Sequence, residues 1–529
     1  MKSIWVFVLL LAVRLFSVFF VKTSYVPDEY WQSLEVAHKI VYGYGYLTWE
    51  WTQGIRSYLH PMVVAGVYKV LSLFGVECVY ALTLLPRILQ ALLTAFADWR
   101  FYKWCHESKW GLFVILTSWF WFYTGSRTII NTLEASLTTL ALSYFPWRGD
   151  SPGYLWFVAL SAFIRPTSVV PWIPLCLHHI RDSRISAPTL LLKQFLPIGL
   201  IVGTLGIGID YFGHGSLVFT PLRFFKVNVL ENIGSFYGSQ PWYWYFLAGL
   251  PAVLGVNTLP FLLSIVETFT QPRLVGVTRR KILLISIATT LVVFSALEHK
   301  EFRFVLPILP MCLYLCADLL SRWSRKASSL AIWTVVVTLL VGNALPAGYM
   351  GFCHQRGTTD VMPALAKIAR EYKSPEGERA SVLFLMPCHS TPLYSHIHTN
   401  VSLRFLTCEP NLTDDPGYED EADKFYRNPT NWLDGNIPAY PPSERPTHLV
   451  LFDSLKEKIS GFLRDYRETH SFAHADYLIS DRIGKNVLIF ERNDQKTGNS
   501  GQSTPPQAKK KPKKEDQPEE YVDARDGEL

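Results

Sequence analysis

An apolar run, IWVFVLLLAVRLFSVFFV (residues 4–21), opens the chain and leads directly into KTSYVPDEYWQ (residues 22–32). The run approaches the roughly 20 residues that cross a bilayer, and no small-x-small cleavage site follows it. We therefore interpret it as an uncleaved first transmembrane helix. Asp28 and Glu29 follow just past the membrane edge, where ionisable side chains are functional candidates by default. The alternative is that Pro27 and the acidic pair begin and cap the next helix.

The composition indicates a membrane protein. Of the 529 residues, 49% are hydrophobic and only 18% are charged, which is less charge than a soluble protein of this size carries. The net charge of +6 comes from connecting loops and from a Lys-rich end. Because these basic residues form no readable motif or single face, the sequence does not indicate a nucleic-acid partner.

Long apolar runs recur along the whole chain. We expect about eleven transmembrane helices, at residues 4–22, 80–98, 111–125, 131–147, 154–165, 168–180, 193–210, 243–270, 281–297, 304–320 and 329–347. A further apolar stretch at 60–75 decides the topology. The basic loops all fall on one side only if this stretch does not cross, so we expect it to be re-entrant or interfacial.

The positive-inside rule also orients the chain. Basic residues such as Arg100, Arg181 and Arg279 then share the cytosolic side with Lys2. The N-terminus is therefore expected in the cytosol, and the first loop (23–79) and the chain after 348 in the lumen. Sequons at Asn400 and Asn411 fall on that luminal side, as glycosylation requires.

The chain divides into three expected domains. Residues 1–350 form the transmembrane domain, and residues 351–494 form a luminal α/β domain with short buried strands at 381–386, 448–452 and 486–490. Helices are expected at 362–372 and 454–465. Residues 495–529 are rich in Lys, Pro and Glu and are expected to be disordered. If the α/β domain lies in an oxidising lumen, two of its three cysteines can pair, namely two of Cys353, Cys388 and Cys408.

Polar residues gather at span ends on the luminal side. Four clusters stand out, and they contain Asp28 to Gln32, Ser126 to Glu134, Arg165 to Thr167, and Glu298 to Phe304. A transporter would instead place ionisable residues near the bilayer midplane in repeated broken helices. A site at one membrane face suits a lipid substrate whose phosphate binds Arg, Lys or His. Transfer of a sugar from a lipid phosphate needs one base beside such cations, whereas a glycosidase needs two separated carboxylates.

The fourth cluster contains His299-Lys-Glu-Phe-Arg-Phe304, which resembles the His-Lys-Glu-x-Arg-Phe signature of the GT22 glycosyltransferase family. The first luminal loop, with its acidic pair, resembles the acidic first luminal loop that is a second hallmark of GT-C-fold enzymes. Four longer segments are similar to the branch of this family that builds the glycosylphosphatidylinositol (GPI) anchor, namely 27–38, 44–51, 386–396 and 425–433. The resemblance covers residues 20 to 492.

This resemblance implies a GT-C fold in the endoplasmic reticulum membrane and an inverting α-1,2-mannosyltransferase. Such an enzyme moves the third mannose from dolichyl-phosphate mannose to the GPI precursor and uses no metal or cofactor. One alternative is a family member that acts on a dolichol-linked oligosaccharide or adds the fourth GPI mannose. A non-catalytic lipid transporter is a third, less favoured, interpretation.

The resemblance also assigns roles to residues. Asp28 is the expected base, with Glu29 as helper or alternative. The expected donor-phosphate ligands are His299, Lys300, Arg303, Arg127 and Arg165. The acceptor or sugar candidates are Tyr30, Trp31, Gln32 and Glu301.

For several aromatic and charged residues, a structural role is an alternative to a role in the site. Tyr30, Trp31, Trp49 and Trp51 are more typical of interfacial anchors than of sugar platforms. We expect His389 and His396 to be structural residues of the α/β domain. Arg87 and Asp98 are expected to be ordinary boundary charges of one span.

Overall fold

We describe a computed structural model of the chain, which places residues 3–147, 149–271, 273, 275–373, 377–412, 415–437, 445–478 and 480–493. Residues 1–492 belong to one compact unit. The expected disordered tail at 495–529 lies outside the described residues.

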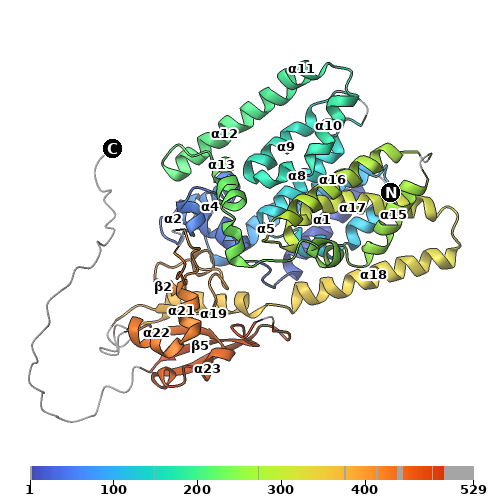
Figure 1. The fold of residues 1–529 in the computed structure, drawn as a ribbon. Helices are drawn as coiled ribbons and strands as arrows, with labels where there is room; N and C mark the ends of the chain where they lie inside the picture. The colour runs from blue at the N-terminus through green and yellow to red at the C-terminus, as the bar shows by residue number, and fades with distance from the viewer. Residues whose placement is uncertain are drawn as a thin grey trace, which may run out of the picture. The chain divides into compact units, whose positions relative to one another are not determined.

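Before residue 353, the regular elements that the structure describes are all helices (Figure 1). The longer ones are α1 (Ser3–Phe20), α2 (Glu35–Tyr42), α4 (Leu59–Leu73), α5 (Val79–Trp104), α6 (Lys109–Thr117), α8 (Ile130–Tyr144), α9 (Gly153–Ile164), α10 (Trp172–Asp182), α12 (Leu196–His214), α15 (Thr258–Thr270), α16 (Val277–Ala296), α17 (Leu309–Trp323) and α18 (Ser329–Phe352). Shorter elements near the site are η1 (Tyr30–Leu34), α3 (Trp49–Thr52), α7 (Trp119–Thr124), α13 (Thr220–Phe225), η5 (Ile233–Tyr237) and η8 (Phe302–Ile308).

Among the described residues, six helical segments are long and apolar enough to cross a membrane. They are Ser3–Phe20, Val79–Trp104, Ala187–His214, Tyr245–Thr270, Phe302–Trp323 and Ser329–Glu371. Other expected spans coincide with helices that are shorter, such as α9, or that begin with several cations, such as α16. The count of about eleven therefore stays a prediction. The ambiguous stretch at 60–75 is α4, whose 15 residues span only about 22 Å, less than the hydrocarbon core of a bilayer.

A buried ion pair joins the first two long helices and corrects one expectation. Asp98 is not a boundary charge, because α5 continues to Trp104 and places Asp98 in its interior. Its carboxylate accepts a hydrogen bond from Nε of Arg14 in α1 at 2.6 Å, and both side chains are fully buried. Two charges removed from water require such pairing, so this contact fixes α1 against α5.

A five-stranded sheet forms the core of the C-terminal part, in the order β2-β1-β3-β5-β4. Its strands are β1 (Ser381–Leu385), β2 (Ser402–Phe405), β3 (His448–Phe452), β4 (Tyr466–Ala473) and β5 (Asn486–Arg492). β1 is parallel to β2 and β3, whereas β5 is antiparallel to β3 and β4. The three expected strands are confirmed. The helices around the sheet are α19 (Gly357–Glu371), α20 (Tyr394–Ile397), α21 (Glu421–Arg427), α22 (Pro429–Asn436) and α23 (Asp453–Lys456).

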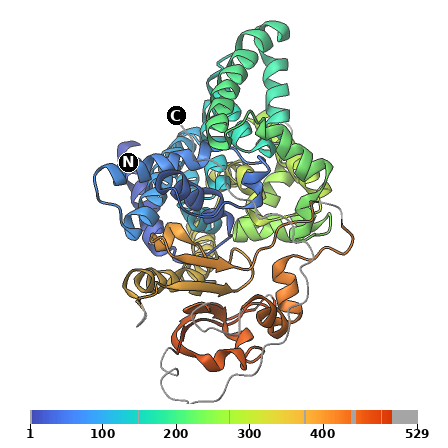
Figure 2. The same cartoon turned by 90° about the vertical axis from the view of Figure 1, so that its left-hand side faces the viewer.

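The two faces of this sheet have different neighbours. Val382 and Phe384 of β1 lie in one apolar cluster with α19 and with residues of η1, α2 and α4. Leu383 and Leu385 point to the other face and pack against α21 and α22. Alternate residues of one strand are thus buried on both sides, which explains its continuous apolar sequence. Figure 2 accordingly shows part of the C-terminal domain directly beneath the blue helices of the loop that follows α1.

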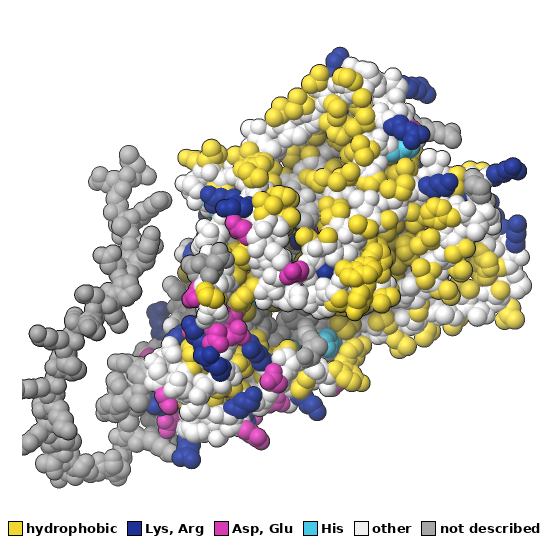
Figure 3. Space-filling view, viewed as in Figure 1, with side chains coloured by type: hydrophobic (Ala, Val, Ile, Leu, Met, Phe, Trp, Pro, Cys, Tyr) yellow, Lys and Arg dark blue, Asp and Glu magenta, His cyan; other side chains and the backbone are white. Residues whose placement is uncertain are grey.

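The surface of the helical part differs in composition from the surface of the C-terminal domain. Hydrophobic side chains cover much of the helical part, whereas charged side chains gather on the C-terminal α/β domain (Figure 3). Many of these exposed apolar residues lie on candidate membrane helices, for example Phe19 on α1 and Trp333 on α18. The structure thus supports a multi-pass membrane protein with a polar domain at its C-terminal end.

Candidate active site

Asp28 and Glu29 lie in a tight turn between α1 and η1. Backbone amides of Glu29, Tyr30 and Trp31 donate back to the carbonyls of Val26 and Pro27, so the chain turns immediately after Pro27. Glu29 stands at the start of η1, but its side chain makes no capping hydrogen bond. The carboxylate of Asp28 forms an ion pair with Arg303. Helix capping therefore does not account for this acidic pair.

Asp28 lines a cavity of about 440 Å³ together with the expected cationic cluster. Its Oδ2 atom lies 2.5 Å from Nη1 of Arg303 at the beginning of η8. The same guanidinium donates to both carboxylate oxygens of Glu301, at 2.8 and 2.5 Å. Glu301 in turn lies 3.0 Å from Nε2 of His299. The structure thus joins the first and fourth sequence clusters in one network, as the sequence predicted.

The electrostatics of this network favour ionised groups. Burial alone would raise the pKa of Glu301, but the charges of Arg303 and His299 hold it at about 2. Burial alone would also lower the pKa of His299, but its hydrogen bond to Glu301 raises it above the usual value. A cavity with these charges can bind an anionic group and can hold a carboxylate in a fixed orientation.

Two more expected phosphate ligands line the same cavity. Arg165 forms a buried ion pair with Glu134 at 3.3 Å, and its guanidinium lies 5.0 Å from the centre of the Phe304 ring. The ammonium of Lys300 donates to the carbonyl of Gln240 at 2.8 Å and to that of Leu297. Both cations therefore already have partners, and a bound anion would add to these contacts or replace some of them.

Glu29 and Arg127 lie elsewhere. Their side chains form an ion pair at 2.7 Å, and both are about 98% or more buried. Arg127 also donates to the carbonyl of Tyr123 and the hydroxyl of Thr23, both at 3.1 Å. This pair lines a second cavity, of about 560 Å³, and not the cavity that contains Asp28. The structure thus separates Arg127 from the other expected phosphate ligands.

The expected acceptor candidates are divided in the same way. Trp31, Gln32 and Glu301 line the cavity of Asp28, whereas Tyr30 lines the second cavity and lies edge-on to His396. The interpretation of Tyr30, Trp31, Trp49 and Trp51 as interfacial anchors is wrong, because all four are less than 9% exposed. The C-terminal domain covers part of this region, so these rings pack inside the protein.

The C-terminal domain supplies part of the cavity wall, which sequence reasoning missed. Cys388 and Cys408 form a disulfide, while Cys353 is free. Both half-cystines and His389 line the cavity of Asp28. His389 is therefore more than a structural residue of its own domain: its ring packs against Trp31 at an interplanar angle of 55°, with 4.4 Å between centres. Burial lowers the pKa of His389 to about 4, so it is neutral at physiological pH.

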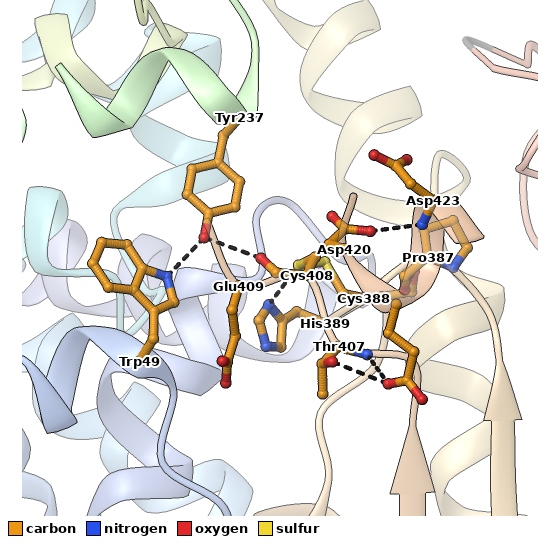
Figure 4. Close-up of a disulfide and its surroundings, with 12 residues drawn as sticks. Trp49, Tyr237, Pro387, Cys388, His389, Thr407, Cys408, Glu409, Asp420 and Asp423 are labelled. Atoms are coloured by element: carbon orange, nitrogen blue, oxygen red, sulfur yellow. Dashed lines mark hydrogen bonds between the residues drawn. A yellow bond between two sulfur atoms is a disulfide. The ribbon is translucent and has the colours of Figure 1, made fainter. Parts of the chain in front are cut away.

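Tyr237 links this wall to the first loop. Its hydroxyl accepts a hydrogen bond from the Trp49 indole at 2.7 Å and donates to the carbonyl of Cys408 at 3.2 Å (Figure 4). The neighbouring pair of Glu50 and Arg56 also lines the cavity, with 2.5 Å between them. The segment from Tyr44 to Trp51 is similar to the family, so its importance could be predicted. Tyr237 belongs to no motif that predicts a place in the site.

Other expected sites are placed as follows. Asn400 is exposed, and Asn411 is partly exposed, although Thr413 of its sequon lies outside the described residues. Cys388, His389 and Cys408 have potential metal-ligand atoms within 4.8 Å of one another. Because both sulfur atoms belong to the disulfide, they do not offer the thiolates that bind a metal.

Comparison with solved structures identifies the type of fold. ArnT from Cupriavidus metallidurans, solved with undecaprenyl phosphate, matches 93% of this chain and 98% of its own with a TM-score of 0.53. At 13% identity, this likeness concerns the fold alone. It supports the expected GT-C type of membrane fold.

Comparison with sequences identifies the family. The model of the Alg9-like mannosyltransferase family matches residues 5–398. GPI mannosyltransferase 3 of Drosophila melanogaster is 58% identical over 476 residues, which cover 90% of this chain and 84% of that protein. GPI alpha-1,2-mannosyltransferase 3 of Homo sapiens is 42% identical over 506 residues, which cover 93% of this chain and 87% of that protein. The chain therefore belongs to the Alg9-like mannosyltransferase family and is a membrane-embedded glycosyltransferase.

Proposed function

We propose that this protein is an α-1,2-mannosyltransferase that adds the third mannose to the GPI-anchor precursor. The donor is dolichyl-phosphate mannose, and the reaction takes place on the luminal side of the endoplasmic reticulum membrane. The N-terminus then lies in the cytosol and the C-terminal domain in the lumen. The names and coverage of the relatives support the acceptor. The polar cavity beside lipid-facing helices supports a lipid-linked donor.

The observation that carries this proposal is the position of Asp28. Its carboxylate is partly exposed in the cavity, with 21% of the side chain accessible, and Arg303 holds it from one side. Glu29 is enclosed with Arg127 and is not available to a substrate in that cavity. We therefore assign the base to Asp28 and a positioning role to Glu29.

The chemistry follows from this arrangement. The acceptor hydroxyl gives its proton to Asp28 while its oxygen attacks the anomeric carbon of the mannose. The bond from that carbon to the phosphate oxygen breaks, and its electron pair leaves with dolichyl phosphate. Attack opposite the leaving group converts a β-linked donor to an α-linked product. A base in this position contributes about 10²–10⁴-fold to the rate.

The cations of the cavity stabilise the departing phosphate. Arg303, Arg165, His299 and Lys300 all line the cavity, and the two guanidiniums are held by carboxylates that fix their orientation. Preorganised charge of this kind stabilises charge that develops in the transition state. Phosphate is a good leaving group in this arrangement and needs no separate acid.

Analysis of lipid intermediates in cells that lack the protein tests the function. We expect a GPI precursor with two mannoses to accumulate, and we expect the wild-type chain to restore GPI-anchored proteins at the cell surface. The D28N variant should fail to restore them at normal protein level. The D182N variant is a matched control, because Asp182 is exposed at the end of α10. Accumulation of a three-mannose GPI precursor or of a truncated dolichol-linked oligosaccharide would contradict the proposal.

A further inference from the structure

The second cavity has no role in the transfer reaction described above. It lies where α1 ends and α5 begins, with Val18, Phe19 and Val79 among its apolar residues. Part of α19 from the C-terminal domain lines it as well. Its volume of about 560 Å³ is within the range of about 300–1,000 Å³ that is usual for ligand sites.

This cavity has an excess of positive charge. Lys22, Arg87, Arg127 and Arg370 line it, and Glu29 is the one carboxylate among its described lining residues. Four cations and one carboxylate leave three positive charges. Glu29 forms its ion pair with Arg127, and no ion pair joins Lys22, Arg87 or Arg370 to a carboxylate of the described residues.

Arg87 carries a buried donor that no group of the described residues satisfies. One of its terminal nitrogens donates to the carbonyl of Val21 at 2.9 Å, but its Nε is buried without a hydrogen-bond partner in the described structure. A buried unsatisfied donor costs about 1–3 kcal/mol, more for a charged group. An anionic ligand in this cavity would provide the missing acceptor.

The surroundings of the cavity point to a lipid. α1 and α5 are both candidate membrane spans, and the ends of the two helices that line the cavity are adjacent. Phe19 and Tyr80, which line the cavity, are 53% and 67% exposed. A free phosphate ion would gain nothing from this apolar wall, whereas a lipid could bind its phosphate to the cations and keep its chains in the bilayer.

We propose that the second cavity is a binding site for the phosphodiester headgroup of a lipid, with Lys22, Arg87 and Arg370 as its ligands. Two sources offer this chemistry. One is the phosphatidylinositol part of the acceptor, which would anchor the acceptor while its sugars reach Asp28. The other is a phospholipid of the surrounding membrane. Only the first source depends on the proposed function.

A binding experiment on the full-length chain tests the site without any transfer reaction. The purified protein in detergent micelles is titrated with tritiated phosphatidylinositol, and tritiated diacylglycerol serves as the uncharged probe. We expect saturable binding of phosphatidylinositol only. In the triple variant K22Q/R87Q/R370Q its affinity should fall at least ten-fold.

Two further variants distinguish a loss of binding from a loss of folding or of overall positive charge. Because Arg87 supports the end of α1, the double variant K22Q/R370Q changes exposed side chains only and should still lose about three-fold or more in affinity. The control R181Q/R184Q/K193Q removes three exposed cations away from the cavity and should bind like the wild type. Equal binding by the wild type, the double and triple variants and the control would overturn the proposal.

Kinetics with the double variant distinguish the two sources. If the acceptor occupies the site, its KM rises, the donor KM does not change, and added phosphatidylinositol competes with the acceptor. If a membrane phospholipid occupies the site, added phosphatidylinositol raises kcat of the wild type but not of the variant. Absence of transfer by the wild type would contradict the proposed function and leave the binding result standing.

Discussion

Asp28 and Glu29 are consecutive residues whose carboxylates lie in two different cavities. Asp28 pairs with Arg303 at 2.5 Å, and Glu29 pairs with Arg127 at 2.7 Å. The turn after Pro27 directs the two side chains apart. Their substitutions should therefore have different consequences, one on chemistry and the other on folding.

Replacement of Asp28 by Asn should lower kcat by about 10²–10⁴-fold, because the amide cannot take the proton of the acceptor hydroxyl. The donor KM should change by less than about three-fold, since the cations of the cavity remain. Transfer from radiolabelled dolichyl-phosphate mannose in microsomes measures both quantities. A D28N enzyme with near-normal kcat would contradict the assignment of the base.

Replacement of Glu29 by Gln should destabilise the protein by about 3–5 kcal/mol, because it leaves the buried charge of Arg127 without its carboxylate partner. Thermal unfolding in detergent and the steady-state protein level both report this loss. E371Q is the matched control, since Glu371 pairs with Lys367 on an exposed helix surface. A stable E29Q protein with a selective loss of kcat would instead make Glu29 part of the chemistry.

Replacement of Arg303 by Lys should reduce kcat by about ten-fold or more, although the charge is kept. Arg303 contacts both oxygens of Glu301 and also Asp28, and an ammonium cannot reproduce this planar geometry. K326R, a change at a cation that does not line the cavity, should leave kcat unchanged. A wild-type kcat in R303K would show that the positive charge at position 303 is sufficient for the reaction and that the planar guanidinium is not required.

The affinity for the donor should depend on pH through His299. Burial lowers the pKa of His299, but the hydrogen bond and charge of Glu301 outweigh burial and raise it above the ordinary 6.5, so the positive charge is present below the ordinary pKa and is lost as the pH rises through the raised pKa. The donor KM should therefore increase with pH over that interval. In H299Q this increase should disappear. A donor KM that depends on pH equally in the wild type and in H299Q would assign the effect to another group.

Removal of the disulfide should loosen the cavity wall that contains His389. The disulfide joins residues 20 positions apart, and the chain-entropy model gives about 3 kcal/mol for a loop of that size. C388S/C408S should therefore lower the stability of the C-terminal domain, measured by limited proteolysis, and should raise the acceptor KM. C353S, at a free exposed cysteine, is the control. Unchanged proteolysis and acceptor KM in C388S/C408S would contradict this role of the disulfide.

Much of the site could be predicted from the sequence because its key residues are concentrated in two short segments. Asp28 lies next to a membrane run, and His299 to Arg303 lie between two others, so both segments reach the membrane edge. Residues that enter the site from distant segments could not be found in this way. Tyr237 lies in a segment with no motif, and His389, although its segment 386–396 carries the family resemblance, reaches the cavity only through tertiary packing.

The errors in the fold have similar physical causes. Arg14 and Asp98 are 84 positions apart, and their pairing depends on how α1 packs on α5. β4 was missed because its sequence, Tyr466 to Ala473, is mostly polar and exposed, as an edge strand of this sheet is. The strands buried on both faces, by contrast, have the apolar sequences that predict them.

The position of His389 in the wall of the Asp28 cavity also determines when this cavity can be completed during translation. Asp28 emerges from the ribosome 361 residues before His389. At about 5–20 residues per second, this delay is roughly 20–70 s. During that time the apolar surface of the first loop, which β1 later covers, has no partner within the chain. The nascent protein should therefore need chaperones until β1 has been translated, and a premature stop codon near residue 380 should produce a chain that is degraded.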